Sequence, residues 1–535
     1  MIDPIRLEVF KHLFAAIPEE MGVILQKASF SPNIKERRDF SCALFDASAR
    51  MIAQAAHIPV HLGAMPLSVQ AAIDRFQGPD SQSPLQTGDV IVLNDPFQGG
   101  SHLPDITLVT PVFVAQEIDG RPTQSLQGFT ANRAHHADVG GMAPGSMAIG
   151  REIYQEGLII PPIKVVEGGR INRSVWDLVL ANVRTPQERA GDLHAQLAAN
   201  QRGADRFAGL LTRYGVDQIA GYSAVLLEYT ERLTRNLLQA IPDGGYTYTD
   251  YLDDDGVSDA PVPITVTVEI RGDRARVDFS GSAPEQAGSV NAVRAITLSA
   301  VNYVFRLLLG QDVPNNSGAL APIEVITPAG SIVNARHPAP VAGGNVETSQ
   351  RITDVLLGAL AQALPDRIPA ASQGTMNNLT LGGLDRRSEN PRPFTYYETL
   401  GGGLGGGPLR PGVSARHVHM SNTLNTPIEA LEYAYPIQVD RYEIRSGSGG
   451  AGLHPGGEGL RRDVRVLSVA EANLIGERRR FQPYGLQGGE PGAYGENVLI
   501  RDGLEIPLPA KGKIDLQPGD ILSIRTPGGG GWGQP

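Results

Sequence analysis

Cysteine is nearly absent from this chain, and so are long apolar runs. One cysteine, Cys42, stands among 535 residues, which excludes disulfides within the chain and metal clusters built only from thiolates. Sparse cysteine is typical of a reducing compartment, so we expect a cytoplasmic protein. No run approaches the roughly 18 apolar residues of a membrane helix. Acidic residues occupy the N-terminus where a secretory signal would be basic and then apolar. We therefore expect a soluble, unprocessed chain that engages no membrane.

Basic residues are fewer than acidic residues. The sequence has 46 Lys and Arg against 57 Asp and Glu, a formal net charge of -11, so a nucleic acid is not the expected partner. The short basic run from Arg478 to Arg480 is predicted to be a solvated surface patch. In contrast, 63 Gly and 40 Pro indicate many tight turns.

Two familiar catalytic motifs are missing from the sequence. No G-x-x-x-x-G-K-[ST] phosphate loop is present to cradle a nucleotide, and no G-x-S-x-G motif points to an α/β-hydrolase. Gly401, Gly403 and Gly406 satisfy G-x-G-x-x-G, yet prolines follow where a dinucleotide-binding helix would begin. We interpret these glycines as turn or close-approach positions. Cys42 lies beside apolar residues, which favours a packed thiol over a nucleophile.

Apolar spacing predicts both helices and strands. Residues 3–28 show helical spacing, and short apolar runs broken by Gly and Pro predict strands over 38–139. Thr185, Pro186 and Glu188 resemble a helix start with a capping box, and this helical arm is expected to run in pieces to Ile241.

The second half of the chain shows the same mixture. Alternating residues predict a hairpin that turns at Gly272–Asp273, and helices are expected near 291–309 and 351–364. After Tyr442 the sequence is Gly-rich with short strands. We predict a mixed α/β (α+β), multidomain fold. The expected parts are an N-terminal metal-site domain with a helical arm (1–240), a central α+β domain (241–440) and a Gly-rich, β-containing C-terminal domain (441–535).

Most of the metal-ligand chemistry falls in one window. NDPFQGGSHLPD contains Asp95, His102 and Asp105, and NRAHHADVGG contains His135, His136 and Asp138. Histidine and aspartate together suit Zn, Mn or Fe better than Ca or Mg. His102 and Asp105 can face one ion from their loop, with His135 and the upstream Asp39 as further donors.

The same side chains can also have purely structural roles. The histidines can instead cap turns or hydrogen-bond to backbone carbonyls. Asp138 can orient a ligating imidazole, or it can cap the turn at Gly140–Gly141.

Several long motifs, in order along essentially the whole chain, resemble the hydantoinase B/oxoprolinase family. They are ERRDFSCALFD, HIPVHLGAM, NDPFQGGSHLPD, NRAHHADVGG, DFSGSAP, HMSNTLNTPIEALE, SGSGGAGLHPGGEG and PGGGGWG. The resemblance implies the B subunit of an ATP-dependent hydrolase of cyclic amides such as hydantoins, 5-oxoproline or lactams. A hydantoinase A-type ATPase subunit, in a heterotetramer or larger assembly, would bind ATP and phosphorylate the carbonyl oxygen.

The resemblance also implies site residues. Carried over by motif, the ligands of a divalent metal (Zn, Mn or Fe) are Asp39, His102, Asp105 and His135, and His136 is expected to line the pocket. Such a metal lowers the pKa of bound water, which would attack the phosphorylated intermediate as hydroxide.

Two histidines remain outside this ligand set. His57 and His61 are candidates for proton transfer or substrate contact, and equally for bracing a Pro-containing turn.

Two other functions stay open. The chain resembles subunits of ketone carboxylases, in which the metal would stabilise an enolate that attacks activated CO2. It can also be a non-catalytic structural partner of an ATPase subunit.

Overall fold

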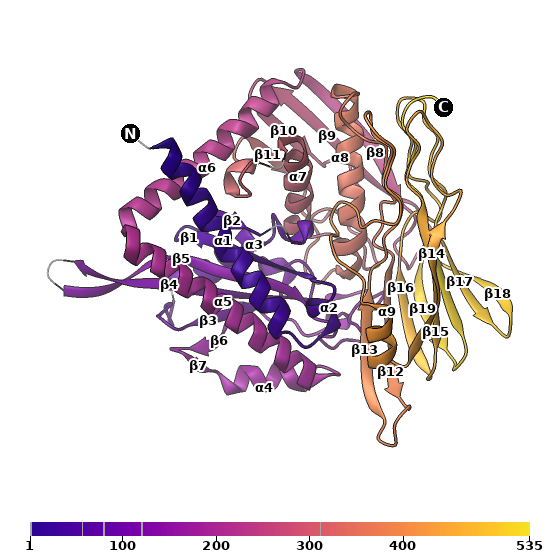
Figure 1. Cartoon of the computed structure of the whole chain (residues 1–535), viewed down its shortest axis with the longest axis horizontal. Coiled ribbons are helices and arrows are strands. Elements are labelled where there is room, and N and C mark those ends of the chain that lie inside the picture. Colours follow the sequence, from indigo (N-terminus) through magenta and orange to yellow (C-terminus); the bar gives the residue numbers. More distant parts are fainter. Residues whose placement is uncertain (1–2, 56, 79–80, 119–120, 311) are drawn as a thin grey trace.

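The computed structural model describes residues 3–55, 57–78, 81–118, 121–310 and 312–535. Helices and four β-sheets make up the described chain, which confirms a mixed α/β, multidomain fold. Figure 1 shows the N-terminal half, with its long helices, on one side and the C-terminal strands on the other. The window that contains most of the candidate metal ligands, residues 95–138, lies within the N-terminal half.

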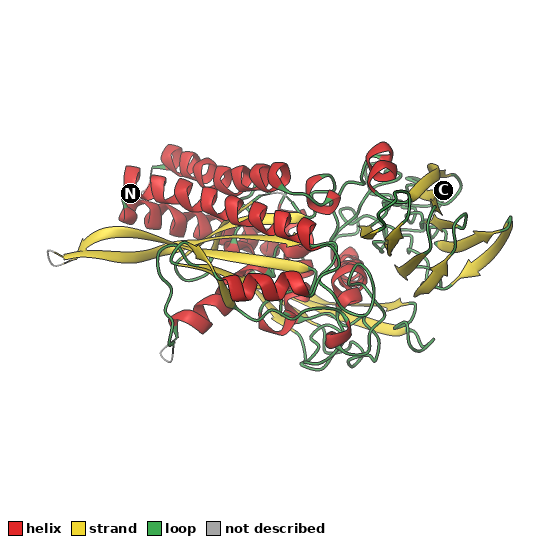
Figure 2. Cartoon of the chain, turned by 90° about the horizontal axis from the view of Figure 1, so that it is seen from below, coloured by secondary structure: helices red, strands yellow, loops and turns green. Residues whose placement is uncertain are grey.

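The first sheet has seven strands in the order β2-β1-β5-β4-β3-β6-β7. Their bounds are β1 Phe40–Asp46, β2 Met51–Gln54, β3 Val90–Leu93, β4 Asp105–Ile118, β5 Arg121–His135, β6 Ile163–Glu167 and β7 Arg170–Ile171. The pairing of β4 with β5 is antiparallel, and it makes the long hairpin that projects from the molecule in Figures 1 and 2.

Helices cover both faces of this sheet. On one face, Phe10 and Phe14 of the opening helix share an apolar core with Phe40 and with Phe207 of α5. On the other face, Met65 of α3 packs in a second core. The helices are α1 Pro4–Ala28, α2 Pro32–Lys35, α3 Met65–Gln77, α4 Arg173–Ala181, α5 Pro186–Tyr214 and α6 Val216–Gln239. The predicted helix over 3–28 and the helical arm in pieces are thus confirmed.

The capping prediction at the start of that arm is wrong. Thr185 is the residue before α5, but its side chain makes no capping hydrogen bond. Glu188 instead pairs with Arg189, whose guanidinium is buried beside Asp192. The Glu188 carboxylate, which a capping box would need, is therefore engaged in the ion pair with Arg189.

The second sheet follows the helical arm, in the order β11-β10-β9-β8. The predicted hairpin turns at Gly272, where a positive φ of 58° suits a residue without Cβ. Buried and half-buried residues alternate along β9, so one face of the sheet packs inward. The elements are β8 Gly244–Leu252, β9 Val262–Arg271, β10 Arg274–Asp278, β11 Ile323–Ile326, α7 Arg294–Leu309 and α8 Ser349–Ala363.

Two further sheets complete the chain. The third has the order β13-β12-β16-β19 and the fourth β14-β15-β20-β17-β18. Because β12 pairs with β16, strands of one sheet lie on both sides of the boundary predicted at 440/441. The elements are β12 Asn378–Asp385, β13 Arg392–Glu398, α9 Ile428–Ala434, β14 Ile437–Arg445, β15 Gly459–Val466, β16 Ala470–Ile475, β17 Glu496–Arg501, β18 Leu504–Leu508, β19 Lys511–Leu516 and β20 Ile521–Arg525.

The sequence predicts a solvated patch at Arg478–Arg480, and this prediction is wrong. Arg478 is fully buried and donates to Asp250 at 2.8 Å and to Asp354 at 2.6 Å. Arg479 is half-buried and bonds to asparagine side chains, and only Arg480 is exposed. Buried charge needs a partner of opposite sign, and these acids come from β8 and α8, far away in sequence. The run therefore joins the C-terminal strands to the second sheet.

The G-x-G-x-x-G segment allows close backbone approach, as predicted. A Cβ on Gly403 would lie 1.9 Å from the carbonyl oxygen of Gly457, which no side chain tolerates. No helix begins in the described residues directly after it. Among the described helices, none is both long and apolar enough to cross a membrane.

Candidate metal centre

Three strand ends of the first sheet meet at the candidate site. Asp105 opens β4 and His135 closes β5, and the two residues are directly paired in the antiparallel register. Asp39 immediately precedes β1, and its carbonyl oxygen accepts from the backbone N–H of His135 at 3.0 Å. His102 lies in the loop that leads into β4. The sheet register therefore brings together residues that are far apart in sequence.

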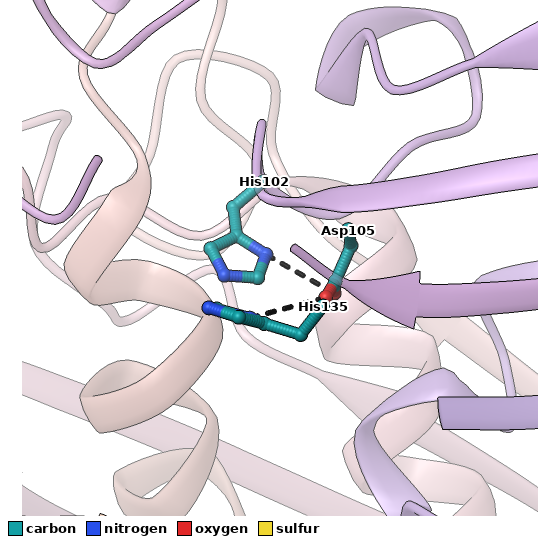
Figure 3. Close-up of side chains that lie close together, drawn as sticks. All are labelled: His102, Asp105 and His135. Atoms are coloured by element: carbon teal, nitrogen blue, oxygen red, sulfur yellow. Dashed lines mark ion pairs between the residues drawn. The ribbon is translucent and has the colours of Figure 1, made fainter. Parts of the chain in front are cut away.

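His102, Asp105 and His135 form a tight cluster (Figure 3). Each offers one ligand atom, and these atoms lie within 4.8 Å of one another. Nδ1 of His102 is 3.1 Å from Oδ2 of Asp105, and Nδ1 of His135 is 3.4 Å from Oδ1. All three residues are buried, with at most 2% of their surface exposed. Asp39 is also buried, but its carboxylate is not in this group of three.

The donor set fits a divalent metal. Nε2 of His135 and Oδ1 of Asp105 are buried and have no hydrogen-bond partner, and such atoms are costly unless something binds them. Two imidazoles and a carboxylate are donors that Zn, Mn and Fe accept.

Electrostatics favour the ligating forms of these side chains. Burial raises the pKa of Asp105, but His102 and His61 outweigh it, so the pKa lies well below its usual range. Burial lowers the pKa of His135, against the opposing influence of Asp105 and Asp39. An ionised carboxylate and a neutral imidazole are the forms that bind metals.

His61 lies beside the cluster. Its Nε2 is 3.3 Å from Oδ2 of Asp105, and its Nδ1 is 2.9 Å from the Ser41 hydroxyl. His57 packs its ring against Phe40, and burial, with lesser effects of His61 and Arg38, lowers its pKa to about 4.

Three residues of the predicted window make other contacts. His136 is buried, and its Nε2 lies 2.9 Å from Oε1 of Gln196 on α5. Asp138 accepts from the backbone N–H groups of Gly140 and Gly145 and pairs with Arg184. Its oxygens therefore cap the turn, the second of the two roles considered for it, and do not orient a ligating imidazole. Asp95 accepts from the backbone of Phe97 in a short 3-10 turn.

Cys42 is a packed thiol, as predicted. It is fully buried in the core under α1, and burial raises its pKa far above the ordinary value. A thiol with so high a pKa is a poor nucleophile at neutral pH.

Sequence reasoning missed a short π-helix (Gly344–Thr348) that precedes α8. Nδ2 of Asn345 lies 3.5 Å from Nε2 of His102, and its Oδ1 is buried without a partner. Glu347 is buried and accepts from Asn378, and burial, with the charge of Glu477, raises its pKa to about 8. Such π-turns occur often at functional sites. No local motif marks either residue, because Asn345 contacts His102 in a much earlier loop and Glu347 bonds to Met376 and Asn378 beyond α8.

The third sheet also reaches the site. Tyr397 of β13 stacks on His135, and the Arg37 guanidinium lies 4.9 Å from the centre of the Tyr397 ring. Asn33 donates to the carbonyl oxygen of His135 at 2.6 Å. Tyr397 of the third sheet thus packs against the imidazole of His135, and Asn33 of α2 holds its backbone.

Fold and site together define a multidomain α/β protein with a buried His-Asp-His cluster of metal-binding type. The hydantoinase B/oxoprolinase family model matches residues 3–535. The chain belongs to this family.

Two relatives illustrate its breadth. An uncharacterized protein of Methanocaldococcus jannaschii is 42% identical, over 100% of this chain and 91% of its own length. 5-Oxoprolinase 1 of Arabidopsis thaliana is 40% identical over 99% of this chain, but the match covers only 42% of that relative. The chain therefore spans about two fifths of the plant enzyme.

Solved structures share the fold. ATP-dependent caprolactamase from Pseudomonas jessenii is 31% identical with a TM-score of 0.90, covering 100% of this chain and 92% of that one. Acetone carboxylase has a TM-score of 0.87 at 19% identity, covering 99% of this chain and 76% of that one. This second likeness shows the fold alone.

Proposed function

We propose that this chain is the metal-dependent B subunit of an ATP-dependent cyclic amide hydrolase. The observation that carries the proposal is the buried cluster of His102, Asp105 and His135 in a member of this family. The names of two relatives, 5-oxoprolinase and ATP-dependent caprolactamase, support the reaction class, because each name denotes the opening of a ring amide.

The metal ligands in this proposal are Asp39, His102, Asp105 and His135. Asp39 is included because its backbone bonds to His135 and its charge acts on that imidazole. A bound Zn, Mn or Fe ion would supply Lewis acidity and lower the pKa of a water molecule.

Neighbouring side chains of the chain support these ligands. The side-chain amide of Asn345 lies beside Nε2 of His102, and with its oxygen turned toward that nitrogen it would accept from the ring N–H, as carbonyl groups commonly do for ligating histidines. His61, hydrogen-bonded to Ser41 and next to Asp105, is placed to hold or move a proton, and the neutral ring of His57 is a second candidate. Burial of the cluster limits the access of bulk water.

ATP would be used by a hydantoinase A-type ATPase partner. The sequence lacks a phosphate loop, and more than half of the plant 5-oxoprolinase lies outside the match, which leaves room there for an ATPase. Phosphorylation of the amide oxygen makes it a leaving group. Water then adds to the carbonyl carbon, and the ring C–N bond breaks as its nitrogen takes up a proton, which leaves an open-chain acyl phosphate. A second water displaces phosphate from this acyl phosphate and gives the carboxylate. The proposed assembly is a cytoplasmic heteromer.

An activity assay with the ATPase partner tests this function. The purified complex is given ATP with 5-oxoproline, a hydantoin or caprolactam, with and without labelled bicarbonate. We expect ring opening that requires ATP, releases one phosphate per ring and incorporates no label. Labelled carbon fixed into a ketone would contradict hydrolysis in favour of carboxylation, and the absence of any turnover with all three rings would leave a structural role.

A further inference from the structure

A cavity of about 380 Å³ lies between α7, α8 and the glycine-rich loop 404–419. Its apolar wall includes Leu307 and Leu308 of α7, Leu357 of α8 and the neighbouring Ile368 and Pro369. A volume of this size and a mostly apolar wall suit a small ring compound.

The two arginines are the permanently charged side chains of the described cavity wall, so its charge has one sign. Arg367, Arg410, His417 and His419 line the cavity, and none of its described lining residues is Asp or Glu. Neither arginine is in any ion pair of the described chain. In a chain with a net charge of -11, cationic groups without acidic partners favour an anion. The surface cleft at Arg235 and Arg276 differs, since Glu269 and Glu324 line it as well.

Two histidines belong to the wall. Nδ1 of His417 is 3.1 Å from the Ser421 hydroxyl, and its Nε2 is buried. Burial, with a smaller effect of Arg37, lowers the pKa of His417 to about 4, so this ring is neutral. Nε2 of His419 is 3.5 Å from Asp354 behind the wall.

The loop that forms the cavity wall is bonded to elements next to the metal centre. Gln350 of α8 donates to the carbonyl oxygen of Val418 in the cavity wall at 3.0 Å. Gln350 follows Asn345, the residue beside His102, by five positions along the π-helix and the start of α8. Downstream of the cavity, Asn422 donates to the carbonyl oxygen of His57. The loop that forms the wall thus continues directly into the surroundings of the cluster.

We infer that this cavity binds a small organic anion with an apolar ring, on its way to or from the metal centre. Resting on the proposed function, this inference makes the ligand a cyclic amide that carries a carboxylate or has been phosphorylated. Both forms present an anionic oxygen group to Arg367 and Arg410.

Calorimetric titration of the full chain tests the inference. The probes are 5-oxoproline, 2-pyrrolidinone, which has the same ring without the carboxylate, and inorganic phosphate. Arg410→Met and Arg367→Met are compared with Arg392→Met, a change at an exposed arginine outside the cavity. We expect saturable binding of 5-oxoproline, phosphate or both that is at least ten-fold weaker in the cavity variants and unchanged in Arg392→Met.

The probes distinguish the two anion sources. Binding of 5-oxoproline alone assigns the site to a carboxylate, and binding of phosphate that competes with 5-oxoproline assigns it to the phosphorylated form. Equal affinity for 2-pyrrolidinone, equal binding by all variants, or no binding of either anion would overturn the inference.

A repeat with metal-depleted chain separates this inference from the proposed function. Retained anion binding without metal supports a site in the cavity itself, and its loss would place the anion on the metal and overturn the inference.

Discussion

The ring of Tyr397 stacks on the ring of His135, with centroids 4.4 Å apart and planes inclined by 14°. Tyr397 belongs to the third sheet and His135 to the first. The Tyr397 hydroxyl donates to Asn378 at 2.9 Å, and Asn378 in turn donates to Glu347 of the π-helix. The orientation of one imidazole of the candidate metal centre therefore depends on packing between distant parts of the chain.

This stacking predicts different effects for two substitutions. Tyr397→Phe keeps the ring but leaves Asn378 without its donor, so we expect a loss of about 1 kcal/mol in unfolding free energy and unchanged metal content. Tyr397→Ala removes the ring and should cost about 3–5 kcal/mol, with weaker metal retention. Denaturant unfolding and metal analysis measure both. Equal metal retention by the two variants would show that the stacking does not orient His135.

Asn345 predicts a metal-affinity effect without loss of the fold. In Asn345→Ala, His102 loses the amide group beside its Nε2, and we expect metal affinity to fall by about 10- to 100-fold. Competition with a chelator measures this change. Gln362→Ala, on the exposed part of α8, is the control and should bind metal as the unchanged chain does. Wild-type affinity in Asn345→Ala would remove Asn345 from the account.

The raised pKa of the buried Glu156 carboxyl implies that stability depends on pH. Its Oε1 accepts from the backbone of Val341 and Ala342, just before the π-helix, and burial raises its pKa from 4.5 to about 8. Because the folded chain keeps this proton longer than the unfolded chain, stability falls as pH rises from about 4.5 to about 8.

Glu156→Gln should remove this contribution while keeping both backbone hydrogen bonds. We expect the thermal midpoint of Glu156→Gln minus that of the unchanged chain to increase between pH 5 and pH 8.5. Glu152→Gln, at an exposed position nearby, is the matched control. A constant difference in midpoint across this range would contradict a raised pKa for Glu156.

Arg478 predicts a large stability effect in the buried charge network. Arg478→Met leaves Asp250 and Asp354 with less compensation in the interior, which should cost about 3–5 kcal/mol of unfolding free energy. Arg465→Met breaks a surface pair with Asp440 and should cost less than about 1 kcal/mol. Similar losses in the two variants, measured by denaturant unfolding, would argue against a buried network.

Local patterns predicted the long helices, the hairpin at Gly272 and the C-terminal strands, because apolar period and turn residues are local properties. They failed at Arg478, since burial of an arginine depends on acids supplied by other elements. The strand pairing across residue 440 was not visible for the same reason.

The candidate site was predicted to a similar extent. His102, Asp105 and His135 were recognised from motif and residue type, and the sheet register explains how they meet. Asn345 and Tyr397 were not, because a single sequence does not show which distant segments pack together. Nothing local distinguishes their side chains from ordinary polar and aromatic residues.

Metal analysis of the purified chain tests the central claim most directly. Elemental content is measured for the unchanged chain, for His102→Ala and His135→Ala, and for His12→Ala, a control at an exposed histidine of α1. The account predicts about one equivalent of Zn, Mn or Fe in the unchanged chain and the control, and almost none in the two cluster variants, with unaltered circular dichroism. Full metal content in both cluster variants, or full activity of a metal-free chain, would contradict it.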